Sequence, residues 1–194
     1  MNIDKPVSTF EAFCKIIADY ARGYDDFALL LTENVPECRE LGAIPEDKIV
    51  MKEAAAHAAL LRAAGLALAG VKPWVLGRSL ELVGGSYAQI REAVAMPRLP
   101  IRIAAIDGGF SSASDGAAKQ LFSDIALART IPGMNLFVPS DAVSLRGIIE
   151  KGGAPFYVRL GRTPLPALEN PAGEIFKLGG ARILRSGSDV TICA

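Results

Sequence analysis

Two hydrophobic periods alternate along the chain. Over residues 7–21, apolar side chains recur at three- and four-residue spacing, which predicts a helix with one buried face. Residues 27–31 form a short, continuous apolar run, which is typical of a strand covered on both faces. The same patterns predict further helices at about 52–69, 87–95, 119–129 and 141–151, and further strands at 73–76, 101–106, 135–138 and 156–160.

Strands that alternate with helices of this length predict an α/β fold, in which a mostly parallel sheet carries helices on both faces. Ligands of such sheets bind where the strands end, at their carboxyl ends. We therefore expect functional residues in the loops at 77–86, 107–116 and 161–166. The polar, irregular segment 33–48 is expected to be a loop.

The sequence changes in character near its end. Residues 176–183 and 189–194 resemble two short strands that follow Pro171. We therefore expect one domain over 1–168, followed by a linker and the first strands of a truncated C-terminal domain over 169–194.

Composition and charge exclude several classes of function. The 194 residues carry 21 Lys and Arg against 21 Asp and Glu, so neither nucleic acid nor an anionic membrane is an expected partner. The three cysteines form no C-x-x-C pair, which favours a reducing, cytoplasmic setting. His57 is the only histidine, which argues against a histidine-built zinc site. The apolar run 54–71 contains His57 and Arg62, and we interpret it as a soluble helix rather than a membrane span.

Few motifs assign a chemistry by themselves. Neither GxGxxG nor GxxxxGK[ST] occurs, so no nucleotide-binding fingerprint is present. Gly84-Gly85-Ser86 could form an anion-binding nest, although a turn between strand and helix is the better interpretation. Arg159 and Arg162 follow a predicted strand, where they either grip a phosphate or carboxylate or remain solvated.

Asp107 and Asp115 bracket a Gly-Ser loop, and Lys119 follows four residues after Asp115. The pair Asp115 and Lys119 fits a helix cap with a surface ion pair. It fits equally well a polar cluster at the carboxyl end of a strand. A desolvated Lys119 could also act as an amine nucleophile, but a solvated or ion-paired lysine is the better interpretation.

Five stretches, taken in order, resemble the transketolase family. Each is modest alone, but their order and spacing over about 50–162 are specific. They are AAGLALAG at 63–70 with Lys72-Pro73, YAQIR at 87–91, DG at 115–116 with Gln120 and DIALARTIP at 124–132, VPSDA at 138–142, and PFYVRLGR at 155–162. This resemblance implies the pyrimidine-binding domain of a transketolase-type thiamine diphosphate enzyme.

The resemblance also implies a composite site. In this family the cofactor lies between two domains, and the other domain holds the diphosphate and Mg²⁺ through a G-D-G…N-N motif. That motif does not occur here, so we expect this chain alone to bind neither thiamine diphosphate nor magnesium. The implied partners are a second copy of the chain, a diphosphate-binding chain of a split transketolase, and a sugar phosphate.

Several site positions depart from the family pattern. The position of the glutamate that activates the cofactor holds Ala56, and alanine exchanges no proton. Glu53 lies one helical turn earlier and could substitute only if the helix were shifted. The aromatic residues that pack on the pyrimidine fall at Arg78 and Glu81, and two histidines fall at Asp107 and Lys119.

Two substrate-binding positions match the family. The resemblance assigns Asp115 to a substrate hydroxyl and Arg162 to the sugar phosphate. The sequence thus leaves two functions open. One is a transketolase-like subunit for ketol transfer between phosphosugars. The other is a non-catalytic binding or scaffold module on the same fold.

Overall fold

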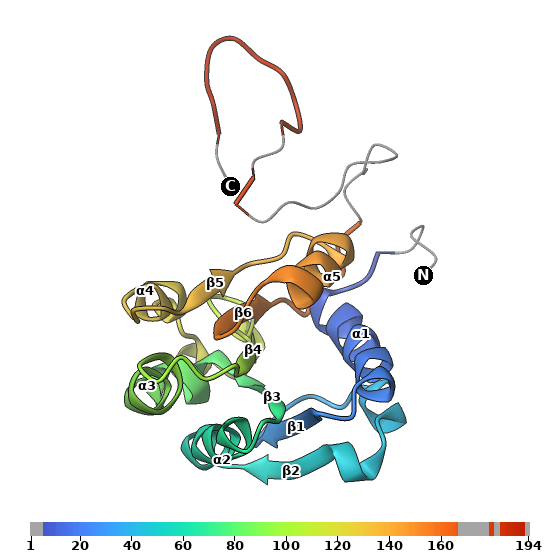
Figure 1. Ribbon diagram of the computed structural model, residues 1–194. Helices are drawn as coiled ribbons and strands as arrows, with labels where there is room; N and C mark the ends of the chain where they lie inside the picture. The colour runs from blue at the N-terminus through green and yellow to red at the C-terminus, as the bar shows by residue number, and fades with distance from the viewer. Residues whose placement is uncertain (1–5, 167–178, 181–182, 193–194) are drawn as a thin grey trace.

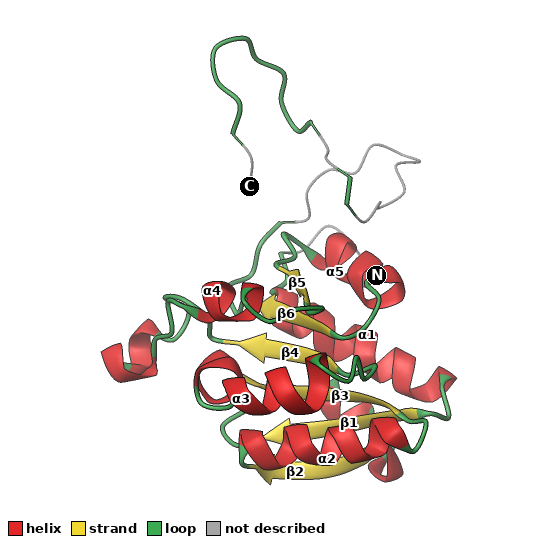
Figure 2. Ribbon diagram, turned by 60° about the vertical axis from the view of Figure 1, so that its left-hand side comes forward, coloured by secondary structure: helices red, strands yellow, loops and turns green. Residues whose placement is uncertain are grey.

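Six strands form a sheet in the order β2-β1-β3-β4-β6-β5, in a computed structural model that describes residues 6–166, 179–180 and 183–192. Neighbouring strands pair in parallel throughout, as the arrows of Figure 2 show. The α/β fold with a parallel sheet is therefore confirmed. The strands are β1 (Phe27–Thr32), β2 (Ile49–Ala54), β3 (Lys72–Arg78), β4 (Arg102–Ile106), β5 (Asn135–Phe137) and β6 (Phe156–Leu160).

Helices cover both faces of the sheet (Figure 1). One face carries α1 (Thr9–Gly23) and α5 (Ala142–Lys151), and both of these helices begin with a capping box, built on Ser8 and Asp141. The other face carries α2 (Ala56–Leu68), α3 (Tyr87–Gln89), α4 (Asp124–Arg129) and the π-helical turns η3 (Leu80–Gly84) and η4 (Ile90–Ala95). Single 3₁₀ turns connect these elements: η1 (Leu41–Ala43), η2 (Glu46–Lys48), η5 (Ala113–Asp115) and η6 (Ala117–Lys119).

The two faces are packed with different kinds of side chain. Under α1 and α5, the rings of Phe13 and Phe156 both lie 5.5 Å from that of Trp74, which is fully buried. Under α2, small residues such as Ala59 and Ala63 are fully buried and let the helix lie close to the sheet. Within the described residues, no helix is both long and apolar enough to cross a membrane.

Several predicted boundaries are wrong. The helix expected from residue 52 begins at Ala56. Residues 49–54 form the edge strand β2, in which Lys52 and Glu53 are exposed. The helix expected over 119–129 begins only at Asp124. The segment 87–95 is one short α-helical turn followed by the π-helical turn η4.

The domain division expected at the C-terminal end stays a prediction. Residues 183–192 form no strand, whereas most of the segment 176–183 and the last two residues of 189–194 lie outside the described residues. The proposed domain limits at 168 and 169 also fall outside the described residues.

Gly77 lets β3 pass close to the end of β1. A Cβ atom at this position would overlap the Thr32 hydroxyl, and Thr32 is buried. We expect Gly77→Ala to lower the free energy of unfolding by about 1–3 kcal/mol, because a well-packed site must shift to admit the methyl group. Thermal unfolding of the single variant and of the double variant with Thr32→Ala measures this overlap. Equal destabilisation in both backgrounds would contradict it.

Candidate functional site

Charged residues converge at the carboxyl edge of the sheet. Arg78 ends β3, Asp107 follows β4, and Arg162 follows β6. Arg162 Nε lies 2.6 Å from Asp107 Oδ1, and Arg78 Nε lies 3.3 Å from Asp107 Oδ2. The loop residue Asp115 completes the group, with its Oδ2 2.9 Å from Arg78 Nη1. We call these four residues the edge cluster; it contains Asp107 and Asp115 but not Lys119.

Asp107 is the buried centre of the edge cluster. Its side chain is only 1% exposed, whereas those of Arg78 and Arg162 are 16% and 33% exposed. Asp107 forms ion pairs with both arginines. Neither of its carboxylate oxygens accepts a hydrogen bond, because the arginine N–H groups are not aligned with them. Two arginines face two aspartates, so the cluster has no net charge. Asp107 also has a φ of 60°, a left-handed conformation that aspartate tolerates better than most residues.

Arg78 also connects the edge cluster to the neighbouring strand. Its Nε donates a hydrogen bond of 3.1 Å to the carbonyl of Asn34, which follows β1. This position was predicted to bring a charge where the family has an aromatic ring. The charge is present, and the two aspartates neutralise it.

The structure does not form the ion pair of Asp115 and Lys119 that one of the two interpretations required. Asp115 pairs with Arg78 rather than with Lys119, and the helix on which the predicted pair depended starts later. Lys119 ends the turn η6, and its side chain is exposed. The desolvation that an amine nucleophile requires is therefore missing at Lys119. Among the described residues, no group of three or more His, Cys, Asp or Glu side chains is arranged to hold a metal ion.

A buried polar network, which the sequence did not indicate, lies beneath the edge. The Tyr157 hydroxyl lies 3.0 Å from Ser79 Oγ and 3.2 Å from Asp124 Oδ2, and Ser79 Oγ donates to the Ile106 carbonyl at 2.9 Å. Arg159 Nε lies 3.3 Å from the same Asp124 oxygen. Burial raises the pKa of Tyr157, so its hydroxyl remains a donor. Arg159 is thus ion-paired with Asp124 through Nε, while its side chain is 24% exposed.

Two glycines make this network possible. A Cβ atom at Gly108 would overlap Asp124 Oδ2, and one at Gly109 would overlap Arg159 Nη2. Because Gly108 and Gly109 carry no side chains, they leave room for the Asp124–Arg159 contact. The sequence offered only weak signals for this network, because Asp124 begins a helix and Tyr157 lies inside an apolar strand.

A cavity of about 250 Å³ opens beside Ala56, at the N-terminus of α2. Glu81 is in its lining, and the Oε2 atom of Glu81 is buried without a hydrogen-bond partner. Such an atom costs about 1–3 kcal/mol unless a ligand or water satisfies it. The lining residues are Thr32, Glu33, Ala54, Ala55, Ala56, His57, Glu81, Gly85 and Ser86.

Three sequence candidates lie in or near this cavity. His57 lines it and is exposed, as befits a surface histidine on the first turn of α2. Glu53 belongs to β2 and is exposed, so the helical shift that would let it replace Ala56 does not occur. The backbone N–H groups of Gly85 and Ser86 bond to Leu80 and Leu82 carbonyls, so the segment is a turn and not an anion nest.

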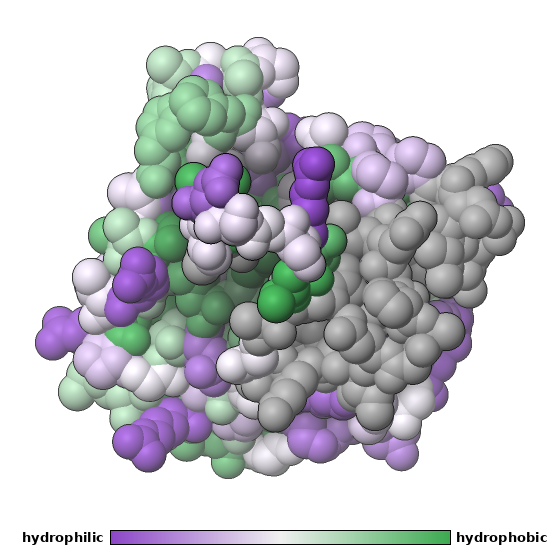
Figure 3. Space-filling model, turned by 90° about the horizontal axis from the view of Figure 1, so that it is seen from above, coloured by the Kyte–Doolittle hydropathy of each residue, from purple (hydrophilic) through white to green (hydrophobic). Residues whose placement is uncertain are grey.

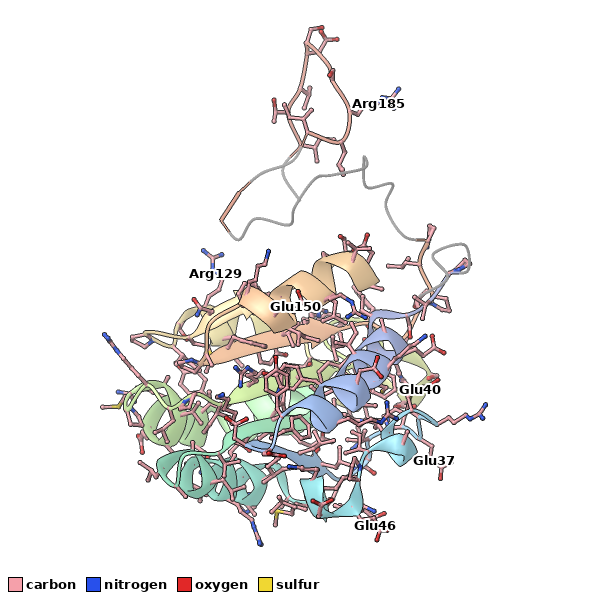
Figure 4. All side chains as sticks on the ribbon, turned by 45° about the vertical axis from the view of Figure 1, so that its right-hand side comes forward. Glu37, Glu40, Glu46, Arg129, Glu150 and Arg185 are labelled. Atoms are coloured by element: carbon pink, nitrogen blue, oxygen red, sulfur yellow. The ribbon has the colours of Figure 1, made fainter. Side chains whose placement is uncertain are left out.

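A second hollow, of about 370 Å³, lies beside Arg162 and the start of α1. Its charged lining consists of Arg162 and Arg39 together with Glu11, Glu37 and Glu40. The last two belong to the segment after β1 and are labelled in Figure 4. Three carboxylates against two arginines give this hollow no excess of positive charge. Viewed from above, hydrophilic and hydrophobic residues are mixed over the surface (Figure 3).

Similar proteins identify the family. The model of the transketolase pyrimidine-binding domain matches residues 50–166. One of the subunits of the apulose-4-phosphate transketolase of Phocaeicola vulgatus is 35% identical over 134 residues, which are 68% of this chain and 43% of that protein. The 6-deoxy-6-sulfo-D-fructose transketolase subunit of Clostridium sp. (strain MSTE9) is 33% identical over 136 residues, 68% of this chain and 42% of that protein.

The fold of this chain is also similar to that of a solved structure. A split-gene transketolase, described as an inactive beta4 tetramer, has a TM-score of 0.78 at 28% identity, and the match covers 94% of this chain and 60% of that one. This chain therefore spans less than two thirds of the relatives that it matches. From the family model, the relatives and the fold together, we conclude that the chain belongs to the transketolase family, as a pyrimidine-binding domain.

Proposed function

We propose that this chain supplies the pyrimidine half of a composite thiamine diphosphate site for ketol transfer between sugars. The proposal rests on one observation above all. The cavity beside Ala56 adjoins the edge cluster, because Thr32 and Glu33 line the cavity and the next residue, Asn34, accepts a hydrogen bond from Arg78. A ring in the cavity and a sugar at the edge cluster would therefore be neighbours.

The residues present fit one part of thiamine diphosphate. The cavity is smaller than the roughly 300–1,000 Å³ of sites that enclose a drug-sized ligand, so it suits a single ring. Its walls include the apolar Ala54 and Ala56, and the polar side chain of Glu81 also belongs to the lining. The thiazolium ring of the bound cofactor would supply the carbanion that carries the ketol group.

The diphosphate must be held elsewhere. A diphosphate needs a metal ion or several donors to offset its charge. The sequence has no G-D-G…N-N motif. A second chain that carries this motif would complete the site, as the names of two relatives, each called a transketolase subunit, suggest for those proteins.

The edge cluster would bind the sugar. Asp115 is about one-third exposed and would accept a hydrogen bond from a substrate hydroxyl. Arg162 faces Asp107 through Nε, and a guanidinium has five N–H donors, so its outer nitrogens would remain for a terminal anion. The names of both relatives specify sugars with such an anion, a phosphate or a sulfonate.

Isothermal calorimetry of mixed chains tests the proposal. The partner is a chain from the same genome with the G-D-G…N-N motif, titrated with thiamine diphosphate and Mg²⁺ in the presence and absence of this chain. We expect binding to strengthen by at least about tenfold when both chains are present, because each supplies part of the site.

One outcome would contradict the proposal, and one variant serves as its control. Equal binding by the partner alone and by the mixture would contradict it. The variant Arg129→Gln, whose residue is labelled in Figure 4, is a suitable control, because Arg129 is exposed at the end of α4 and belongs to neither the cavity lining nor the edge cluster. It should bind as the wild type does.

Ala56 and Asp107 favour a second candidate function. Ala56 carries no group that transfers a proton, and the Asp107 carboxylate lies 2.6 Å from Arg162, where it competes with a substrate anion. A non-catalytic binding or scaffold module on the same fold would need neither group. Ketol transfer by the mixed wild-type chains would contradict this alternative.

A further inference from the structure

The backbone just before Asp107 is held by a side chain of the neighbouring strand. Ser79 directly follows Arg78, and its hydroxyl donates a hydrogen bond of 2.9 Å to the Ile106 carbonyl. This carbonyl belongs to the peptide bond that joins Ile106 to Asp107. Ser79 and Ile106 are both fully buried, so the contact lies out of reach of solvent. One hydrogen bond therefore ties the residue after Arg78 to the residue before Asp107.

The backbone just after Asp107 rests on a buried ion pair. Gly108 lies against the Asp124 carboxylate and Gly109 against the Arg159 guanidinium, so closely that neither glycine has room for a Cβ atom. Asp124 is fully buried, and its Oδ2 atom lies 3.3 Å from Arg159 Nε. The position of the segment after Asp107 therefore depends on where this ion pair lies.

Tyr157 joins these two supports into one network. Its hydroxyl lies 3.0 Å from Ser79 Oγ and 3.2 Å from Asp124 Oδ2, and its side chain is buried. Asp107 lies between the two supports and has a φ of 60°. Such a left-handed conformation costs energy in a residue other than glycine, and it persists only where the surrounding structure imposes it. The network imposes it here, because it fixes the backbone on both sides of Asp107.

We propose that Ser79 and Asp124 are positioning residues for the edge cluster. They act through the backbone on either side of Asp107, and the Asp107 carboxylate in turn orients the guanidinium groups of Arg78 and Arg162. The effect on sugar binding rests on the proposed function, in which the edge cluster holds the sugar. The effect on the edge cluster itself does not.

The arginine Nε–H signals in nitrogen-15 NMR spectra of the full chain test the positioning without a partner or ligand. In the wild type, the Nε atoms of Arg78 and Arg162 face Asp107 at 3.3 and 2.6 Å. We expect Ser79→Ala and Asp124→Asn each to shift both signals. We also expect hydrogen exchange of these groups to speed up at least about threefold, because a less constrained Asp107 leaves them open to water more often.

Ser86→Ala is the matched control for these signals. Ser86 is also buried, and its hydroxyl also donates a hydrogen bond of 2.9 Å to a backbone carbonyl, that of Glu81. The two serines flank the same turn, η3, but only Ser79 bonds to the strand that leads into Asp107. Exchange at both arginines should stay within about 1.5-fold of the wild type in this control. A response as large as that to Ser79→Ala would overturn the inference.

Folded variants whose arginine signals and exchange rates match the wild type would also overturn the inference. Far-ultraviolet circular dichroism shows whether each variant is folded. Where Asp124→Asn does not fold, Tyr157→Phe takes its place, because it removes only the hydroxyl that lies between Ser79 and Asp124. The same expectation and the same contradicting result apply to it.

Kinetics of the mixed chains separates the inference from the proposed function. With thiamine diphosphate, Mg²⁺, D-fructose 6-phosphate and an aldose phosphate acceptor, Ser79→Ala should raise KM for the ketose at least about threefold and change kcat less. An unchanged KM would contradict the effect on sugar binding. No ketol transfer by the wild type, with arginine signals that respond to Ser79→Ala, would refute the proposed function alone. Transfer by the wild type, with arginine signals that do not respond, would refute the inference alone.

Discussion

Asp107→Ala is expected to lower the free energy of unfolding by about 3 kcal/mol. The substitution leaves Arg78 and Arg162 at the sheet edge without their shared carboxylate, and breaking a buried ion pair costs about 3–5 kcal/mol. We expect the lower end of this range because both arginines are partly exposed and water can reach them. Urea unfolding followed by the fluorescence of Trp74, the only tryptophan, measures the change.

Two further variants identify the cause. Asp107→Asn keeps a residue that tolerates the φ of 60° and removes only the charge, so it isolates the electrostatic part. Asp115→Ala removes the partly exposed aspartate of the same cluster and should cost less than about 1 kcal/mol. If Asp107→Ala and Asp115→Ala were equally stable, Asp107 would not be the centre of the cluster.

Trp74→Ala should be at least as damaging, with an expected loss of about 3–5 kcal/mol. Its ring is fully buried between Phe13 and Phe156, and the guanidinium carbon of Arg102 lies 5.5 Å from it. Removal would therefore open a cavity in the core under α1 and take away the ring beneath that guanidinium. Because the variant has no tryptophan, unfolding has to be followed by far-ultraviolet circular dichroism.

Trp74→Phe is the informative comparison. The indole N–H is buried without a hydrogen-bond partner, so phenylalanine removes an unsatisfied donor together with some volume. We expect this variant to lose no more than about 1.5 kcal/mol, as for other conservative core changes. A loss as large as that of Trp74→Ala would show that the indole N–H is satisfied after all.

The sequence pattern predicted buried strands better than exposed ones. β1, β3, β4 and β6 are apolar because helices cover them on both faces, and each was found near its predicted place. β2 was missed because it includes the exposed residues Lys52 and Glu53, whereas β5, the strand at the other edge, was found near its predicted place. Edge strands need no continuous apolar run, so their sequences resemble helix starts or loops.

The residues of the edge cluster were all named from the sequence, Arg78 and Asp107 as departures from the family pattern, but their contacts were not, and their roles stay predictions. Arg78, Asp107, Asp115 and Arg162 were all singled out, and the parallel topology explains why the ends of β3, β4 and β6 meet. The choice of partner could not be predicted. A pair of Asp115 with Lys119, four residues away, was one of two open interpretations, and Asp115 pairs instead with Arg78, thirty-seven residues away.

The sequence by itself determined the family and the α/β order of elements, because these depend on local periodicity and on residue identity. Only the tertiary structure decided that Asp107 neutralises two arginines and that Glu81 has a buried oxygen without a partner beside Ala56. Burial and pairing depend on residues brought together by the parallel strands, and the spacing of residues along the chain carries no information about these distances.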